Sequence, residues 1–113
     1  MKISYKNQSI ERKNSEICVV TEYPRMDKDL DFAIVNISGR YPTYQNAVNK
    51  QCKEIVYIQN GTGIVVVNNI EYLLNAGDVV LIEAGEKFYW EGNMRLFISC
   101  NPPFEVDQHQ LID

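Results

Sequence analysis

Residues 53–93 read KEIVYIQNGTGIVVVNNIEYLLNAGDVVLIEAGEKFYWEGN, and this stretch decides the fold. Short apolar and β-branched runs alternate in it with clusters of Gly, Asn and Asp, and no run is long enough for a helix of ordinary length. The stretch therefore predicts a meander of short antiparallel strands. The predicted strands are 55–59, 64–67, 70–74, 79–82, 87–90 and 94–100, with turns at 60–63, 68–69, 75–78, 83–86 and 91–93.

The flanking segments continue the pattern. The β-branched runs EICVVTE (16–22) and FAIVNI (32–37) predict two further strands, and the polar residues 1–15 fit an edge strand or a loosely held arm. The segment RYPTYQNAVNKQC (40–52) has almost no apolar periodicity, so we predict a long loop, and loops of this length often carry function. The tail FEVDQHQLID predicts one short helical turn and an extended end.

The spacing of these signals indicates the fold class. Turn signals recur every 8 to 12 residues and no helical period is present, which is typical of an all-β sandwich or barrel. A closed barrel is favoured because closure leaves no exposed sheet edges. We therefore predict an all-β protein, a small antiparallel β-barrel or jelly roll, with residues 1–113 as one domain.

Composition excludes several classes of partner. The formal net charge is −4 and the eleven basic residues are scattered, whereas a nucleic-acid surface needs clustered Lys and Arg. No apolar run approaches the roughly 20 residues of a bilayer span. The three cysteines, Cys18, Cys52 and Cys100, form no CxxC pair and fit reduced, buried thiols. We expect no nucleic-acid partner, no membrane partner and a cytoplasmic location.

Two spacings resemble the motifs of the cupin superfamily. Glu54 and Gly61 match the acidic residue and the closing glycine of the first motif, and Gly77 and Gly85 match two glycines of the second. Asn93 lies one residue beyond the asparagine of that second motif. The resemblance covers residues 32–104 and implies a cupin-like double-stranded β-helix there.

The departures from these motifs concern the metal ligands. In the family, three histidines and a glutamate hold a divalent metal at the barrel centre. The histidine positions of the first motif fall here on Val48 and Lys50 or, with the longer spacing, on Ala47 and Asn49, and that of the second falls on Phe88. Only Glu54 remains, and one carboxylate does not make a transition-metal site. We predict no metal and no cofactor, and we expect the only histidine, His109, to be exposed or to pack.

The strand period places Glu54 inside the barrel with Val56 and Ile58, while Ile55 and Tyr57 point outward. A buried carboxylate needs a partner or takes up a proton. Glu54 is therefore either a ligand-anchoring or acid/base group, or a rim residue in an ion pair. The candidate cationic partners are Lys50, Arg40, Arg95 and Lys87, and the candidate ligand-binding residues are Glu54, Tyr41, Tyr44, Asn49, Lys50, Phe88 and Trp90.

Three functions stay open from the sequence. The first is binding of a small polar molecule, a carbohydrate or an organic acid, in the barrel without a transition metal. The second is a metal-independent sugar isomerase or epimerase with Glu54 and a tyrosine as acid/base pair. The third is a dimerising or partner-binding module without a ligand. The resemblance implies a homodimer, with Ile55, Tyr57 and the N-terminal strand supplying the contact.

Overall fold

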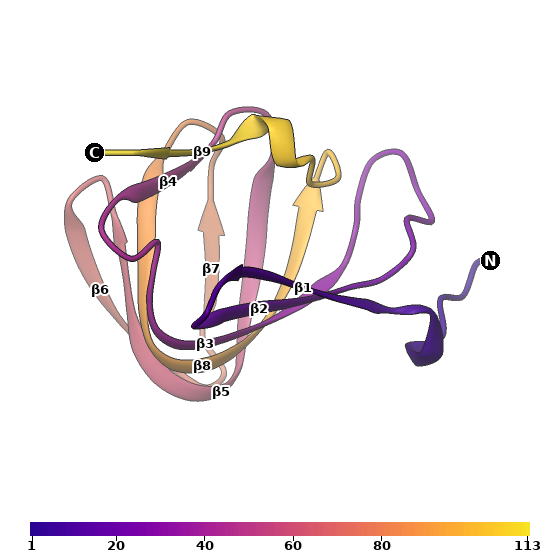
Figure 1. Ribbon diagram of the computed structural model, residues 1–113, viewed down its shortest axis with the longest axis horizontal. Helices are drawn as coiled ribbons and strands as arrows, with labels where there is room; N and C mark the ends of the chain where they lie inside the picture. The colour runs from indigo at the N-terminus through magenta and orange to yellow at the C-terminus, as the bar shows by residue number, and fades with distance from the viewer.

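The fold is built on two long antiparallel strands that pair along their whole length. A computed structural model describes all residues 1–113. In it β5 (Lys53–Val67) and β8 (Lys87–Asn101) pair from Lys53 opposite Asn101 to Val67 opposite Phe88. Figure 1 shows both strands curving together around one side of the molecule. Their shared curvature turns a single sheet into a barrel.

Each long strand carries two shorter strands in succession on its free side. β5 pairs with β6 and β7, and β8 pairs with β3 and β4. Beyond these, β2 pairs with β3, β1 with β2, and β9 with β4. The bounds are β1 Ile10–Ser15, β2 Cys18–Glu22, β3 Ala33–Tyr41, β4 Asn46–Asn49, β6 Ile70–Asn75, β7 Val79–Ile82 and β9 His109–Ile112, with 3-10 turns η1 Lys6–Gln8 and η2 Val106–Gln108.

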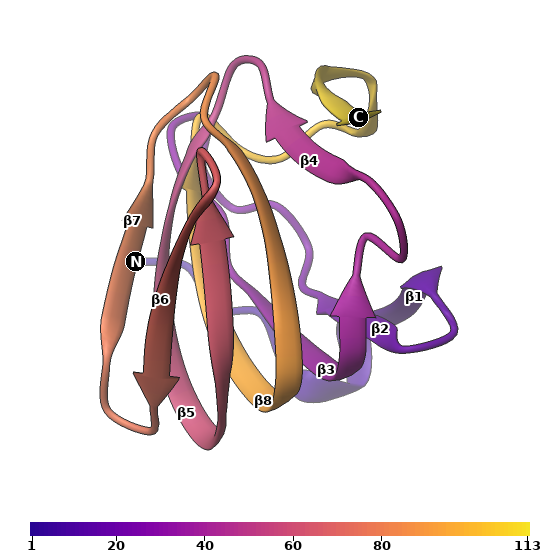
Figure 2. The same cartoon turned by 90° about the vertical axis from the view of Figure 1, so that its left-hand side faces the viewer.

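The curled sheet leaves an interior between its walls. Figure 2 shows β5, β6, β7 and β8 along one side of the molecule and the β1–β2 pair on the other, with β4 above. The all-β class and the antiparallel barrel architecture predicted from turn spacing are confirmed. None of the helical segments has the length or apolar character needed to cross a membrane.

The predicted turns at 60–63 and 91–93 are wrong, because both segments are bends inside continuous strands. Gly61 has φ +88, and a Cβ there would overlap the carbonyl oxygen of Asn93 on the facing strand. Gly92 lies against Gly63, and a Cβ on it would come within 2.6 Å of the Gly63 Cα. Glycine allows the two long strands to approach closely where they bend. A hairpin turn and a bend inside a strand therefore both favour glycine, and composition does not distinguish them.

The remaining turns are confirmed. Asn68 and Asn69, at φ 49 and φ 69, form the two-residue turn between β5 and β6. The turns at 75–78 and 83–86 flank β7 as predicted. The tail also forms a short helical turn and an extended strand.

The predicted long loop over residues 40–52 is wrong in part, because β3 runs on to Tyr41 and β4 occupies Asn46–Asn49. Strand β4 has polar residues at both of its ends, and it pairs with β9, about 60 residues later, and with β8. A pairing partner so distant in sequence leaves no local signal.

The core follows the predicted alternation of β5. Glu54, Val56 and Ile58 are buried, whereas Ile55 and Tyr57 are exposed. Five branched aliphatic side chains with almost no exposure come from β5, β7 and β8, Val56, Ile58, Val65, Ile82 and Leu96. They fill the interior beneath Glu54, which is the first polar residue of β5 on this face.

Candidate functional site

A cavity of about 310 Å³ opens into the barrel between its wall and the β1–β2 pair. It is within the size range of small-molecule sites, and most of the residues around it are hydrophobic. Its polar lining comes from segments far apart in sequence: Arg12, Asn14, Glu22, Arg25, Asp31, Tyr41, Asn49, Glu54 and His109. The barrel therefore holds an apolar pocket with a limited set of polar groups.

Glu54 is the ionisable group on the inner face of β5. It is 7% exposed, and burial, with a smaller contribution from the charge of Asp31, raises the pKa of its carboxyl from 4.5 to about 7. The Sγ of Cys100, its cross-strand neighbour, lies 3.9 Å from Oε2. No cation forms an ion pair with Glu54. The carboxyl is poised to bind or release a proton near neutral pH.

The predicted cationic partners of Glu54 are therefore corrected. Lys50, Arg40, Arg95 and Lys87 do not line the cavity, and none pairs with this carboxylate. Arg40 instead lies over the ring of Tyr89, on the outer face of β8, with its guanidinium carbon 3.7 Å from the ring centroid. The side chains of alternate residues point to opposite sides of the wall. Glu54 is accordingly a buried group and does not take part in a rim ion pair.

His109 enters the cavity from the C-terminal strand. Its Nε2 lies 3.0 Å from the hydroxyl of Tyr41, at the end of β3, and its Nδ1 lies 2.8 Å from Oδ1 of Asn49, its register partner on β4. Burial raises the pKa of Tyr41 to about 12. Burial, with the nearby charge of Arg12, lowers the pKa of His109. At neutral pH this network consists of uncharged side chains.

Gln108 supports the same network from the preceding turn, η2. Its side-chain Nε2 donates to Asn49 Oδ1 at 3.1 Å, and its Oε1 accepts hydrogen bonds from backbone N–H groups at the end of the β4–β5 connection. Gln108 is 4% exposed. Sequence reasoning missed Gln108 and the placement of His109, because both depend on the pairing of β9 with β4.

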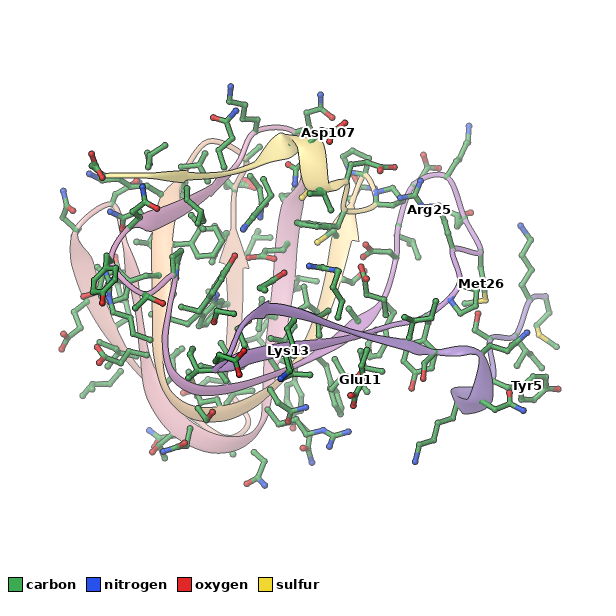
Figure 3. All side chains as sticks on the ribbon, viewed as in Figure 1. Tyr5, Glu11, Lys13, Arg25, Met26 and Asp107 are labelled. Atoms are coloured by element: carbon green, nitrogen blue, oxygen red, sulfur yellow. The ribbon has the colours of Figure 1, made fainter.

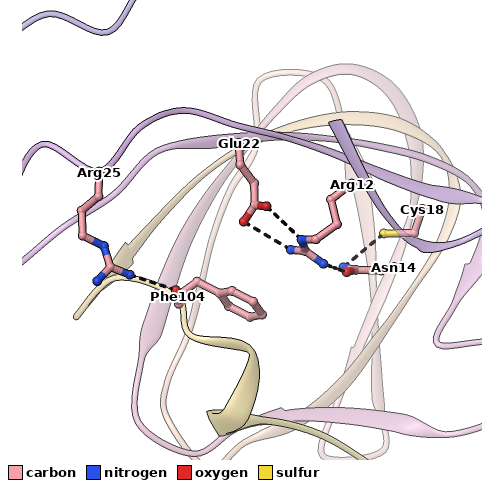
Figure 4. Close-up of polar contacts among 6 residues, drawn as sticks. All are labelled: Arg12, Asn14, Cys18, Glu22, Arg25 and Phe104. Carbon is pink, nitrogen blue, oxygen red and sulfur yellow. Dashed lines mark hydrogen bonds and ion pairs between the residues drawn. The ribbon is translucent and has the colours of Figure 1, made fainter. Parts of the chain in front are cut away.

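An ion pair from the β1–β2 strands covers another part of the cavity (Figure 4). Arg12 Nε donates to Glu22 Oε1 at 2.9 Å, and Arg12 also donates to Asn14. The guanidinium lies 5.6 Å from the ring centroid of Phe104. Both partners of the pair are half-buried. The sequence contains no motif that indicates this pair.

Arg25, labelled in Figure 3, also lines the cavity. It donates to the backbone oxygen of Phe104 at 3.2 Å and forms an ion pair with Glu105 at 2.9 Å. Nearby, the carboxylate of Asp31 accepts backbone hydrogen bonds from Cys100 and Phe104 at 2.7 and 2.9 Å. Both residues hold the end of β8 and the following segment in place.

The three cysteines are free and buried, as predicted. The contact between the Cys52 and Cys100 thiols, together with burial, raises the pKa of Cys100, while the same contact lowers the pKa of Cys52. Burial raises the pKa of Cys18, which lies beside the cavity, to about 11. A raised pKa leaves the thiols of Cys18 and Cys100 protonated and unreactive at neutral pH.

Five of the predicted ligand-binding residues line the cavity: Glu54, Tyr41, Asn49, Phe88 and Trp90. The rings of Phe88 and Trp90 pack edge to face with centroids 6.3 Å apart. Tyr44 is 92% exposed and Lys50 is exposed, and neither lines the cavity. Tyr44 lies in the β3–β4 connection and Lys50 follows β4, where the chain leaves the barrel wall.

The positions of the family's metal ligands are now defined. Ala47 and Asn49 are buried and inward, so the longer spacing of the first motif applies. The inward set is Ala47, Asn49, Phe88 and Glu54, which supplies one carboxylate and one amide. No three His, Cys, Asp or Glu side chains gather as a metal ion would need. These residues do not fit the transition-metal site of the superfamily.

Comparison with known proteins finds one matching family and several solved structures of similar fold. A model of the AraC-like ligand binding domain matches residues 35–91. A structure of Streptomyces Pac13 with uridine, a protein described as a nucleoside dehydratase, has a TM-score of 0.88 at 16% identity and covers 100% of this chain and 92% of its own. No curated protein matches the sequence.

Two further solved structures share the architecture. KdgF from a Halomonas species has a TM-score of 0.74 at 12% identity, covering 95% of this chain and 97% of its own. An RmlC-like cupin from Shewanella frigidimarina has a TM-score of 0.74 at 14% identity, covering 95% of both chains. At these identities the likeness concerns the fold.

Proposed function

This chain belongs to the family of AraC-like ligand-binding domains and has the cupin fold, and from that premise we propose that its barrel binds a small, neutral, hydroxyl-bearing molecule. A monosaccharide or a nucleoside meets this description. The observation that carries the proposal is the cavity of about 310 Å³ with aromatic walls and a few convergent polar groups. The uridine bound by Pac13, a protein of the same fold, supports a ligand of this size.

The charges around the cavity favour a neutral ligand over an organic acid. Arg12 is paired with Glu22 and Arg25 with Glu105, so each arginine would have to leave its carboxylate partner before it could bind an anionic ligand. The other charged groups at the cavity are carboxyls, Asp31 and Glu54. An anionic ligand would meet these carboxyls without an unpaired cation to compensate. Hydroxyl groups can instead exchange hydrogen bonds with Glu54 and with the oxygen of Tyr41.

The proposal includes binding without a transition metal. Its support is the donor set at the family's metal position, where Ala47 and Phe88 replace imidazoles and Glu54 alone is a ligand of the usual kind. Elemental analysis of the purified protein tests this part. We expect far less than one equivalent of iron, manganese, zinc or nickel, and near-stoichiometric metal would contradict it.

The single tryptophan provides a direct test of ligand binding. Trp90 lines the cavity and is the only tryptophan, so its fluorescence reports on the pocket alone. Titration with uridine or glucose is expected to change that fluorescence saturably, and citrate at equal concentration is expected to have a smaller effect. Tighter binding of citrate than of both neutral compounds would contradict the proposal.

A pair of tyrosine variants localises the binding. Tyr41→Phe removes one hydroxyl from the cavity and is expected to weaken uridine binding about five- to tenfold, the value of roughly one hydrogen bond. Tyr44→Phe makes the same chemical change at a residue that is 92% exposed, and it is expected to leave the affinity unchanged. Equal effects of both variants would place the ligand elsewhere.

Acid/base catalysis on a sugar, as in an isomerase or epimerase, is the second candidate function. The favouring observation is that Glu54, whose pKa is raised to about 7, and Tyr41 line one cavity. Glu54→Gln is expected to abolish turnover of a sugar substrate while it retains binding. Unchanged turnover in that variant would remove Glu54 from the chemistry.

We also propose a homodimer formed through the outer face of β5 and β7. Ile55, Tyr57, Val79 and Leu81 are 50%, 43%, 60% and 55% exposed and lie in register on paired strands, with β7 at the sheet edge. The stripe carries no charge, so a second copy meets no like-charge repulsion on it. Light scattering at micromolar concentration is expected to give the dimer mass, with Ile55→Lys monomeric and Leu73→Lys on β6 unchanged. A monomeric wild type would contradict this.

A further inference from the structure

The side-chain amide of Gln108 has one possible orientation, because two backbone N–H groups hold its oxygen. The N–H of Gln51 donates to Gln108 Oε1 at 3.0 Å, and the N–H of Cys52 donates at 3.2 Å. An amide NH2 group cannot accept these bonds. Gln108 Nε2 therefore donates to Asn49 at 3.1 Å, and Asn49 must present its oxygen at that point.

The orientation of Asn49 determines the tautomer of His109. Asn49 Oδ1 is an acceptor and lies 2.8 Å from His109 Nδ1, so Nδ1 carries the hydrogen. The imidazole is neutral because burial and the charge of Arg12 lower the pKa of His109. The lone pair is then on Nε2, and the Tyr41 hydroxyl, 3.0 Å away, donates to it. Two backbone N–H groups thus set the direction of every bond up to Tyr41.

Packing holds the two rings of this network in place. The Tyr41 and His109 rings are nearly parallel, at 8°, and the Phe104 ring packs on the imidazole at 5.4 Å between centroids. The phenol is buried, which raises the pKa of Tyr41 to about 12 and keeps its proton on the oxygen at rest. Tyr41 and Glu54 line the same cavity.

Resting on the pocket proposed above, we propose that His109, oriented by Gln108 and Asn49, forms a proton relay with Tyr41, and that Tyr41 and Glu54 are an acid–base pair acting on a carbonyl-bearing sugar. Gln108 and Asn49 are positioning residues, since they act only through His109. The arrangement resembles a catalytic triad, in which a third group orients the base that activates the reacting group. Here the reacting group is the phenol of Tyr41, the base is His109 and the orienting group is Asn49.

The proton transfers of this relay balance. Tyr41 Oη takes a proton from the carbon beside the ligand carbonyl while its own proton passes to His109 Nε2. The C–H electron pair forms a carbon–carbon double bond, and the carbonyl oxygen takes the proton of Glu54, which gives an enediol, an imidazolium and a carboxylate. Return of the His109 proton through Tyr41 to carbon, and of the enediol proton to Glu54, restores the enzyme.

The single histidine makes the relay directly observable. Proton–nitrogen NMR correlations of the imidazole near pH 7 are expected to show a neutral ring protonated at Nδ1. Asn49→Leu removes the acceptor and is expected to abolish this pattern, whereas Asn46→Ala on the same strand is expected to preserve it. A wild-type ring that is protonated at Nε2 would overturn the relay.

Exchange of the ligand hydrogen tests whether the relay moves protons. The protein in D2O is incubated with ribulose, and loss of the hydrogen signals beside the carbonyl is followed by proton NMR, with Trp90 fluorescence reporting binding. Tyr41→Phe and His109→Gln are each expected to slow the exchange roughly 100-fold or more, while Tyr44→Phe matches wild type. If ribulose binds but its exchange is not catalysed, the relay is overturned. If ribulose does not bind, the proposed ligand class is contradicted instead, and the relay then stands or falls with the measured tautomer of His109.

A pH profile separates positioning by Asn49 from a merely structural role. Asn49→Asp keeps the acceptor but adds a negative charge beside His109, which raises the pKa of the imidazole. The rise of the exchange rate with pH is then expected to shift to higher pH relative to wild type. An unshifted profile would remove Asn49 from the relay.

Discussion

Two strand pairs border the cavity, and they use opposite kinds of polar contact. The β4–β9 pair supplies Asn49 and His109, which are uncharged and hydrogen-bonded to Gln108 and Tyr41. The β1–β2 pair supplies Arg12 and Glu22, an ion pair whose side chains are 31% and 40% exposed.

The two strand pairs form two walls of the cavity, and their polar contacts suit the degree to which each wall is buried. Neutral amides and rings can be buried once their hydrogen bonds are made, so the β4–β9 wall is fixed, and loss of one partner leaves the others unpaired. A half-exposed ion pair keeps part of its hydration and contributes little net stability. The β1–β2 wall is therefore the side on which side chains can rearrange around a ligand.

The largest effect is expected from a substitution that disrupts the uncharged hydrogen-bond network of the β4–β9 wall. Asn49→Leu leaves the Nε2 of Gln108 and the Nδ1 of His109 without an acceptor, and two unpaired buried donors lower the free energy of unfolding by about 3 kcal/mol. Urea denaturation measures the loss. Asn46→Ala, on the same strand but outside the network, is expected to change stability by less than about 1 kcal/mol. Equal losses in both variants would show that the network is not what stabilises this wall.

The second prediction concerns the carboxyl of Glu54, which lines the same cavity. The pKa of Glu54 is raised to about 7, so between about pH 4.5 and 7 the unfolded chain releases this proton while the native protein keeps it. Stability contributed by protonated Glu54 is full below about pH 4.5 and is lost as the pH rises to about 7, by about 3 kcal/mol in all.

Glu54→Gln is neutral at every pH and is expected to remove this dependence. Its stability relative to wild type should rise from about pH 4.5 to about 7 and then level off, as measured by denaturation across that range. Glu83→Gln, at an exposed turn, is the control and should track wild type. A parallel profile for Glu54→Gln would mean that Glu54 ionises normally in the native protein.

The smallest expected effect concerns the charged wall. Arg12→Met removes the ion pair with Glu22 and is expected to lower stability by about 0.5–1 kcal/mol at low salt, with a smaller loss at high salt because ions screen the exposed part of the pair. Lys13→Met, which removes the more exposed pair with Glu16, should have no measurable effect. A salt-independent loss of several kcal/mol for Arg12→Met would show that this pair stabilises the fold as strongly as the uncharged network of the β4–β9 wall.

Local chemistry made much of the fold predictable. The Asn68–Asn69 turn and the alternation along β5 follow from the preferences of single residues and from the two-residue period of a strand. The glycines at 61 and 92 were misread as turns for a physical reason. A turn and a close approach of two strands both require a residue that tolerates positive φ and has no Cβ. Only the position of the facing strand shows which of the two is present at Gly61 and Gly92.

An all-β barrel with Glu54 on its inner face, and without the imidazoles of the cupin metal site, follows from the order of residues along the chain. The contacts of His109 with Tyr41 and Asn49, residues 68 and 60 positions away, and the lack of a cationic partner for Glu54 arise from the folded arrangement of the strands. Strand period and turn chemistry are local properties, whereas the tautomer of a histidine and the pKa of a buried carboxyl depend on neighbours that long-range strand pairing brings together.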